Sequence, residues 1–213
     1  MLSGDILNSL RSQIVVCQKC PLHLGRKKAV PGEGPADAKV MFIGEGPGYH
    51  ENEQGKPFVG QAGAFLDELL AVAGLERSNV FITNVVKCRP PANRDPEPGE
   101  LAACRTYLDK QIDTINPQVI VTLGRFSMSR FLENVRISQI HGHAHLIEGY
   151  TVVTMYHPAA ALHQPALRQA CLQDFSHLKE IITGFKPEKK TPTPSSTPKG
   201  ISEESHIEQL SLF

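Results

Sequence analysis

Residues 39–48 read KVMFIGEGPG, a short apolar run that ends in three closely spaced glycines. Such a run, bounded by turn-forming residues, is typical of a buried strand. Three more segments share this character: 80–84 (VFITN), 119–123 (VIVTL) and 151–155 (TVVTM). Helical spacing of apolar residues follows in 61–73, 98–116, 125–133 and 165–183. Strands that alternate with helices predict an α/β fold with a parallel sheet covered on both faces.

The composition, 40% hydrophobic and 21% charged, is that of an ordinary globular protein. No apolar run reaches the roughly 18 residues of a membrane span, and residues 1–16 have a helical period without a signal-peptide pattern. We therefore expect a cytoplasmic location and no membrane contact. Because 22 basic and 22 acidic residues cancel, phosphate contacts have to come from local basic groups. Two groups stand beside cysteines: Lys19, Arg26, Lys27 and Lys28, and Lys87, Arg89 and Arg94.

The composition changes near residue 184. Residues 186–200 read KPEKKTPTPSSTPKG, without an aliphatic or aromatic side chain, so this segment cannot offset its ordering entropy by burial. We expect a folded body over 1–183, a disordered linker over 184–208 and a terminal peptide, QLSLF, over 209–213.

Four cysteines have the spacing of a metal site. Cys17 and Cys20 form a C-x2-C pair, while Cys88 and Cys104 are distant in sequence. Four thiolates around one centre suit zinc or an iron–sulfur cluster, and the spacing alone leaves both open. Cys171 lies alone among apolar helical residues and is predicted to be a core thiol.

Polar motifs follow the predicted strands. GEGPG (44–48) follows the first, TNVVKCRPP (83–91) includes the end of the second, and YHPAA (156–160) follows the fourth. Ligands of parallel sheets bind beyond the carboxyl ends of the strands, so a glycine turn, an amide and an imidazole are expected at one edge. This combination predicts a pocket for a planar polar group such as a base. Pro47 excludes the dinucleotide fingerprint, because it breaks the helix that would begin there.

Together with the KPFVG segment and the four cysteines, these motifs resemble a family 4 uracil-DNA glycosylase, the iron–sulfur branch of that superfamily, over about residues 10–183. The resemblance implies a three-layer α/β/α sandwich with a four-stranded parallel sheet. It implies a [4Fe-4S] cluster on Cys17, Cys20, Cys88 and Cys104. It also implies hydrolytic excision of uracil from DNA in base excision repair by a bacterial, nucleoid-associated monomer. The enzyme would be monofunctional, since no lysine is assigned as a Schiff-base nucleophile.

The resemblance also implies roles for the pocket residues. Phe58 would stack on the flipped uracil, and Asn84 would pair with its O4 and N3–H, a pattern that cytosine reverses. His157 would donate to O2, where negative charge develops, and the Gly46 backbone would hold the same edge. Glu45 is the first candidate to position water or stabilise the cationic sugar.

Glu51 is the second candidate, or else it crowds C5 and excludes thymine. Family 1 enzymes carry an aspartate where this chain has Gly46, which leaves the water-activating group open. The segment 161–165 resembles the loop that enters the minor groove, with Leu162 as the wedge and Arg168 as a phosphate contact.

The terminal QLSLF is similar to the bacterial sliding-clamp-binding peptide, with Gln209, Leu210, Leu212 and Phe213 as its contacts. His141, His143 and His145 alternate in a way that imitates a metal site, but we expect an exposed loop or edge strand, since no carboxylate or cysteine accompanies them. Two alternatives to the enzyme remain: a non-catalytic uracil-DNA binding scaffold, and a ferredoxin-like electron carrier, which would leave Asn84, His157 and Phe58 unexplained.

Overall fold

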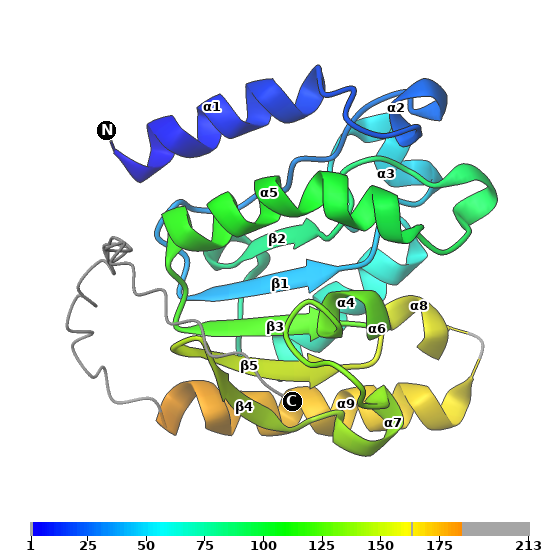
Figure 1. Ribbon diagram of the computed structural model, residues 1–213. Helices are drawn as coiled ribbons and strands as arrows, with labels where there is room; N and C mark the ends of the chain where they lie inside the picture. Colours follow the sequence, from blue (N-terminus) through cyan, green and yellow to red (C-terminus); the bar gives the residue numbers. More distant parts are fainter. Residues whose placement is uncertain (1, 163, 185–213) are drawn as a thin grey trace, which may run out of the picture.

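The computed structural model describes residues 2–162 and 164–184. Its centre is a five-stranded sheet in the order β2-β1-β3-β5-β4. The strands are β1 (Val40–Gly44), β2 (Phe81–Asn84), β3 (Val119–Leu123), β4 (Ala144–Ile147) and β5 (Tyr150–Met155). The first four in spatial order are parallel, so their carboxyl ends share one edge (Figure 1). The expected linker and terminal peptide, from residue 185 onward, lie outside the described residues.

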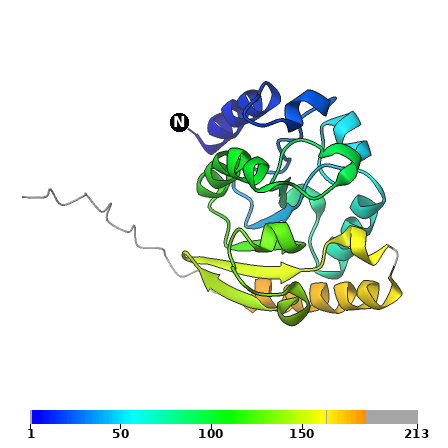
Figure 2. The same cartoon turned by 45° about the vertical axis from the view of Figure 1, so that its right-hand side comes forward.

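Helices cover both faces of the sheet (Figures 1 and 2). The longer ones are α1 (Ser3–Val15), α4 (Gln61–Val72), α5 (Pro98–Ile115) and α9 (Pro165–Gly184). The short ones are α2 (Leu22–Gly25), α3 (Tyr49–Gln54), α6 (Arg125–Met128), α7 (Ile137–Ile140) and α8 (Pro158–Ala161), with 3-10 turns at Arg77–Asn79 and Pro91–Asn93. None of the helices in the described part of the chain has the length and hydropathy of a membrane span.

Two cores lie on opposite sides of the sheet. Phe65, Leu66 and Leu69 of α4 and Phe175 of α9 fill one of them, against the β1 face that carries Phe42. On the other face, Leu108, Ile112 and Ile115 of α5 pack against Met41 and Ile43. Because consecutive strand residues point to opposite faces, the unbroken apolar runs of the sequence are buried on both sides. The predicted three-layer α/β/α sandwich is therefore confirmed.

The sheet differs from the prediction in one respect: it has five strands, and β4 is antiparallel to β5. Glu148 and Gly149, both with positive φ (51° and 80°), form the two-residue turn between them, a backbone that matches the twist of a hairpin. Residues 144–147 alternate between exposed and half-buried positions, as an edge strand does. The expectation of an exposed loop or edge strand around the histidines is thus correct, because His141 and His143 precede β4 and His145 lies in it. The predicted four-stranded sheet did not include this strand.

The helix predicted over 125–133 is also shorter than expected, since α6 ends at Met128. The hydroxyls of Ser127 and Ser129 donate to the carbonyls of Gly124 and Phe126. Such local bonds compete with helix continuation.

Candidate active site

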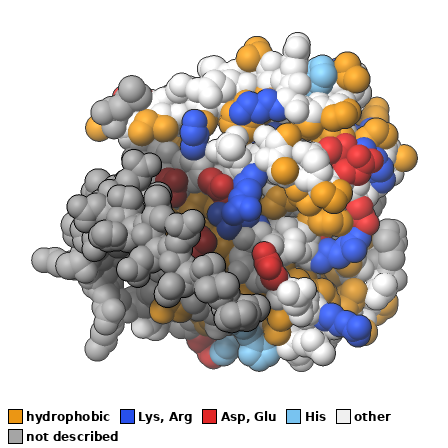
Figure 3. Space-filling model, in the orientation of Figure 1, with side chains coloured by type: hydrophobic (Ala, Val, Ile, Leu, Met, Phe, Trp, Pro, Cys, Tyr) orange, Lys and Arg blue, Asp and Glu red, His pale blue; other side chains and the backbone are white. Residues whose placement is uncertain are grey.

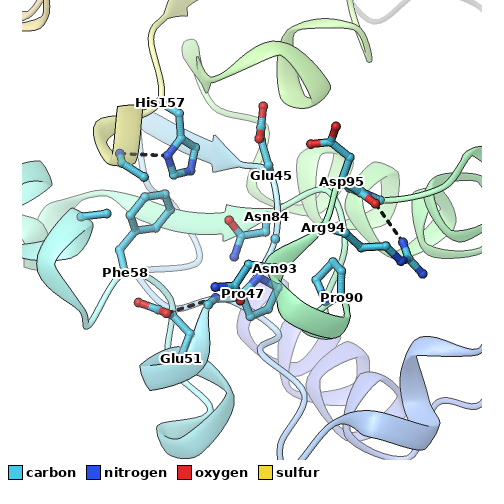
Figure 4. A pocket seen from close by; sticks show the side chains of 15 residues that line it. Glu45, Pro47, Glu51, Phe58, Asn84, Pro90, Asn93, Arg94, Asp95 and His157 are labelled. Atoms are coloured by element: carbon cyan, nitrogen blue, oxygen red, sulfur yellow. Dashed lines mark hydrogen bonds between the residues drawn. The ribbon is translucent and has the colours of Figure 1, made fainter. Parts of the chain in front are cut away.

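A cavity of about 260 Å³ opens at the carboxyl edge of the parallel strands. Figure 4 shows Glu45 from the turn after β1, Asn84 from the end of β2, Phe58, and His157 from the segment after β5 around this space. Gly46 and Glu51 line it as well. The structure thus brings together the six pocket residues that the sequence analysis singled out. The loop of residues 90–96 forms the remaining side.

The Phe58 ring lies beside the His157 ring, with centroids 5.6 Å apart and planes 25° apart. Phe58 has a left-handed backbone (φ 49°), which is unusual for a bulky residue. Its carbonyl packs on α4, where a Cβ on Gly63 would lie 2.0 Å from the Phe58 oxygen. The close approach of Gly63 therefore permits the turn that presents Phe58 to the cavity.

Asn84 is 1% exposed, and its Oδ1 has no hydrogen-bond partner among the described residues. A buried carbonyl oxygen without a donor costs about 1–3 kcal/mol, so the site is incomplete without a ligand that donates to it. Gly44 lies opposite Asn84 in the β1–β2 ladder. A Cβ on Gly44 would come within 2.4 Å of Asn84 Oδ1 and 2.7 Å of the Phe58 ring. Only glycine at this position lets the amide and the ring approach each other.

His157 precedes α8 and caps it, because its Nδ1 accepts a hydrogen bond from the Ala159 N–H at 3.1 Å. An accepting Nδ1 places the ring proton of the neutral imidazole on Nε2. Burial lowers the pKa of His157 to about 4, against the opposing charge of Glu51. His157 is therefore a neutral Nε2–H donor at physiological pH.

Glu45 lies against the start of α6. Its Oε1 accepts a hydrogen bond from the Phe126 N–H at 3.1 Å. Gly124, at φ 97°, leaves room for this carboxylate, since a Cβ there would lie 2.4 Å from Oε1. Burial raises the pKa of Glu45 above its usual 4.5, and the Phe126 N–H partly offsets this effect. The cavity is thus lined by a carboxylate held at an elevated pKa.

Both oxygens of Glu51 are engaged by backbone groups. Oε2 accepts from the Gly48 N–H at 3.1 Å, and Oε1 accepts from the Val59 and Gly60 N–H groups at 2.8 and 3.0 Å. These bonds join the start of α3 to the segment that follows Phe58. The geometry makes Glu51 a brace for the aromatic side of the cavity and leaves Glu45 as the carboxylate with fewer backbone partners.

The loop after β2 contributes to the cavity in a way that was not predicted from the sequence. Asn93, Arg94 and Asp95 line the cavity, and Asn93 Oδ1 accepts from Arg89 Nε at 2.8 Å. Ala92 and Asn93 both have positive φ (51° and 55°). The available signal was the run of Pro, Asn and Asp after the strand, which is typical of a loop at a ligand-binding edge.

A second cavity is lined by all four predicted ligand cysteines, Cys17, Cys20, Cys88 and Cys104. They come from the segment between α1 and α2, the loop after β2, and α5. Arg26 Nη1 donates to Cys88 Sγ at 3.2 Å. Within residues 2–162 and 164–184, no group of three or more His, Cys, Asp and Glu side chains is arranged around a single metal position. The donor set nevertheless fits a sulfur-ligated cluster, because four thiols from three segments face one cavity.

Cys171 lies apart from these four, 1% exposed in the core formed with α4 and α9. The prediction of a core thiol is confirmed.

The other predicted residues have partners inside the protein. Leu162 follows α8 and packs half-buried against the core. Arg168 pairs with Glu68 and stacks over the Phe65 ring at 4.2 Å. On the face drawn in Figure 3, basic and acidic side chains are interspersed.

The histidine group contradicts one expectation. His141 Nδ1 lies 2.8 Å from Asp174 Oδ2, so a carboxylate from α9 does accompany these histidines. The sequence does not indicate this pair, because 33 residues separate the partners.

Comparisons with known proteins agree on one family. Residues 31–179 match the model of the uracil DNA glycosylase superfamily. The chain is 46% identical to a type-4 uracil-DNA glycosylase of Sulfurisphaera tokodaii, over 83% of this chain and 85% of that protein. It is 43% identical to one of Archaeoglobus fulgidus (89% and 97% covered) and 42% identical to one of Thermotoga maritima (84% and 95%). The chain therefore belongs to the uracil-DNA glycosylase superfamily and, within it, to the type-4 uracil-DNA glycosylases.

Proposed function

We propose that this chain hydrolyses the N-glycosidic bond of uracil in DNA and leaves an abasic site in base excision repair. The observation that supports this most is the unpartnered Oδ1 of Asn84, buried beside the Phe58 ring and the neutral His157. Uracil N3–H would supply the missing donor, and the Asn84 Nδ2 would donate to O4. Cytosine has an acceptor at N3 and a donor at its 4-position, so it would leave buried groups unpaired at about 1–3 kcal/mol each.

The base has to leave the helix to reach this site. An extruded uracil would stack on Phe58, which compensates part of the lost stacking in the duplex. Leu162 would enter the minor groove as a wedge and fill the gap that the extruded base leaves in the helix. Arg168 would contact a phosphate once its ion pair with Glu68 is broken. Residues 1–183 would form this catalytic domain.

Bond cleavage places negative charge on uracil O2 and positive charge on the sugar. The Nε2–H of His157 and the Gly46 backbone would stabilise the first, and a preorganised donor of this kind accounts for about 10²–10³ in rate. The Glu45 carboxylate would stabilise the cationic sugar or orient the attacking water. Glu51 would act through its brace on the Phe58 segment. No lysine lines this cavity among the described residues, which supports a monofunctional hydrolase.

The second cavity, which we call the thiol cavity because four cysteines line it, would hold a [4Fe-4S] cluster on Cys17, Cys20, Cys88 and Cys104. When bound, the cluster would join three segments of the chain covalently through iron and stabilise the fold. Arg26 would donate to the Cys88 sulfur there.

Incubation with uracil-containing single- and double-stranded DNA, followed by alkaline cleavage of abasic sites, tests the proposal. We expect strand breaks with the wild type, none with thymine in place of uracil, and a large loss with Asn84→Ala. Tight binding of uracil-containing DNA without breaks would instead support a non-catalytic scaffold.

The partners of the terminal peptide form a separate proposal. Gln209, Leu210, Leu212 and Phe213 would bind a bacterial sliding clamp, and the linker over 184–208 would raise the local concentration of the enzyme at replicating DNA. The chain would act as a monomer in the cytoplasm, at the nucleoid. Deletion of residues 209–213 should abolish clamp binding and leave excision from free oligonucleotides intact; unchanged clamp affinity would contradict this role.

A further inference from the structure

Lys87 is the most deeply buried charged side chain near the active site, at 1% exposure. Its Nζ donates to three oxygens: Thr83 Oγ1 at 2.5 Å, Gln111 Oε1 at 2.7 Å and the Asn84 carbonyl at 2.8 Å. None of the ion pairs among the described residues involves Lys87. A buried ammonium group without a carboxylate is costly, so its retention here calls for a specific role.

The three acceptors are themselves held in place. The Thr83 hydroxyl donates to the Pro31 carbonyl at 3.0 Å, and Gln111 Nε2 donates to the same carbonyl at 2.8 Å. The Lys87 carbonyl accepts from the Val30 N–H at 2.7 Å. The ammonium group therefore joins the end of β2 to α5, with each of its three N–H donors satisfied. Its acceptors and the Lys87 carbonyl bind the segment before β1.

Lys87 faces two sites. On one side it binds the backbone carbonyl of Asn84, whose side chain lines the substrate cavity. On the other side it lines the thiol cavity, next to Cys88 in sequence and across from Cys104. Thiolates bound to a cluster would carry the negative charge that compensates the buried cation.

We propose that Lys87 is a positioning residue: it fixes the backbone of Asn84 from behind and joins the thiol cavity to the base-recognition site. This inference rests on the proposed function. The amide of Asn84 has to meet both N3–H and O4 of uracil, and a displacement of about 1 Å costs on the order of 100-fold in rate. Lys87 itself touches neither the substrate cavity nor the reacting atoms.

A double-mutant cycle with Asn84 tests this role. Lys87→Met removes the charge and the donors but keeps a side chain of similar length. We expect it to lower the single-turnover rate, per cluster-loaded protein, by about 10- to 100-fold. We also expect weaker binding of free uracil by calorimetry and little change in the affinity for uracil-free DNA. Combined with Asn84→Ala, the same change should lower the rate by less than about threefold further, because Lys87 then has no recognition group to position.

If Lys87 has a purely structural role, its effect on the excision rate should be independent of Asn84. Effects of Lys87→Met and Asn84→Ala that multiply, or a Lys87→Met rate within about twofold of the wild type, would overturn the proposal. Leu178→Ala, a core change on α9 on the other face of the sheet, controls for a general loss of stability. If Lys87→Met does not fold, Thr83→Val and Gln111→Leu loosen the ammonium group without removing it. The same non-additivity with Asn84→Ala is then required, and multiplicative effects overturn the proposal.

Cluster content and uracil excision are measured independently, so that a failure of either can be distinguished. Iron and sulfide content and visible absorbance report whether the variant holds the cluster, independently of excision. A wild-type protein that does not excise uracil contradicts the proposed function. Normal excision by both wild type and Lys87→Met contradicts only the role of Lys87.

Discussion

The Nδ1 atom of His157 accepts a hydrogen bond from the backbone N–H of Ala159 at 3.1 Å. One ring nitrogen thus caps α8, and the other is left to donate into the cavity at a fixed angle. Because the same bond sets both the tautomer and the orientation of the ring, the residue is preorganised for an acceptor that gains negative charge.

Replacement of His157 by alanine should therefore impair catalysis more than binding. We expect a loss of about 10²- to 10³-fold in the single-turnover excision rate, with little change in the affinity for uracil-containing DNA. His177→Ala, an exposed position on α9, serves as the control. Equal losses in rate and in DNA affinity would show that His157 contributes to binding rather than to the transition state.

The low pKa of His157, about 4, has a consequence for stability. Between pH 6.5 and about 4, His157 binds a proton in the unfolded chain but not in the folded chain. The stability is therefore full above pH 6.5 and falls as the pH decreases through this window, by about 3 kcal/mol at most. His157→Asn keeps a side chain that can cap α8 but does not titrate. Urea denaturation at pH 7 and 4.5 should show a smaller decrease for this variant than for the wild type; parallel decreases would contradict the assignment.

The raised pKa of Glu45 should appear in the pH dependence of excision. If the ionised carboxylate stabilises the sugar cation or orients water, the rate declines as the pH falls through the pKa of Glu45, which burial places above 4.5. Glu45→Gln should lower the rate at neutral pH by about 10- to 100-fold and remove this part of the acid limb. An unchanged pH–rate profile in Glu45→Gln would assign the limb to another group.

Gly44 offers a steric test of the contact between Asn84 and Phe58. Its backbone is ordinary extended strand and does not require glycine, but a Cβ would lie 2.4 Å from Asn84 Oδ1 and 2.7 Å from the ring. We expect Gly44→Ala to displace both side chains and to lower excision at least about 100-fold, with only a modest loss of stability. Gly99→Ala is the matched control, because no neighbouring atom lies within 4 Å of its Cβ. A Gly44→Ala enzyme as active as Gly99→Ala would contradict this geometry.

Much of this arrangement is visible in the sequence, because apolar runs and the motifs that follow them are local signals. The third strand lies at 119–123 as predicted, and Asn84 and His157 meet because parallel strands end at one edge. The edge strand β4 was not counted in the predicted sheet, since its residues alternate in exposure and lack a continuous apolar run.

The contacts that the sequence could not predict depend on how the loops fold at the edge of the sheet. Phe58 reaches the cavity through a left-handed backbone that depends on Gly63, and Glu51 is bound by N–H groups eight and nine residues away. Lys87 was grouped with basic residues expected at phosphates, yet the structure buries it behind Asn84. A charge pattern alone does not distinguish a solvated cation from one held by three oxygens.

The four thiols that line the second cavity allow a test against the fifth. Cys88→Ser should lose iron, acid-labile sulfide and visible absorbance, because a hydroxyl is a poor replacement for a thiolate on a cluster. The loss should also lower the midpoint of thermal unfolding, since the cluster would join three segments of the chain. Cys171→Ser is the matched control: that thiol is also buried but lies in the core with α4 and α9. The Cys171→Ser variant should be less stable than the wild type but should contain the same amount of metal. If the wild type contains one zinc per chain and no sulfide, the four thiols bind zinc and not an iron–sulfur cluster. Equal metal content in Cys88→Ser and Cys171→Ser would exclude the cavity as the ligand site altogether.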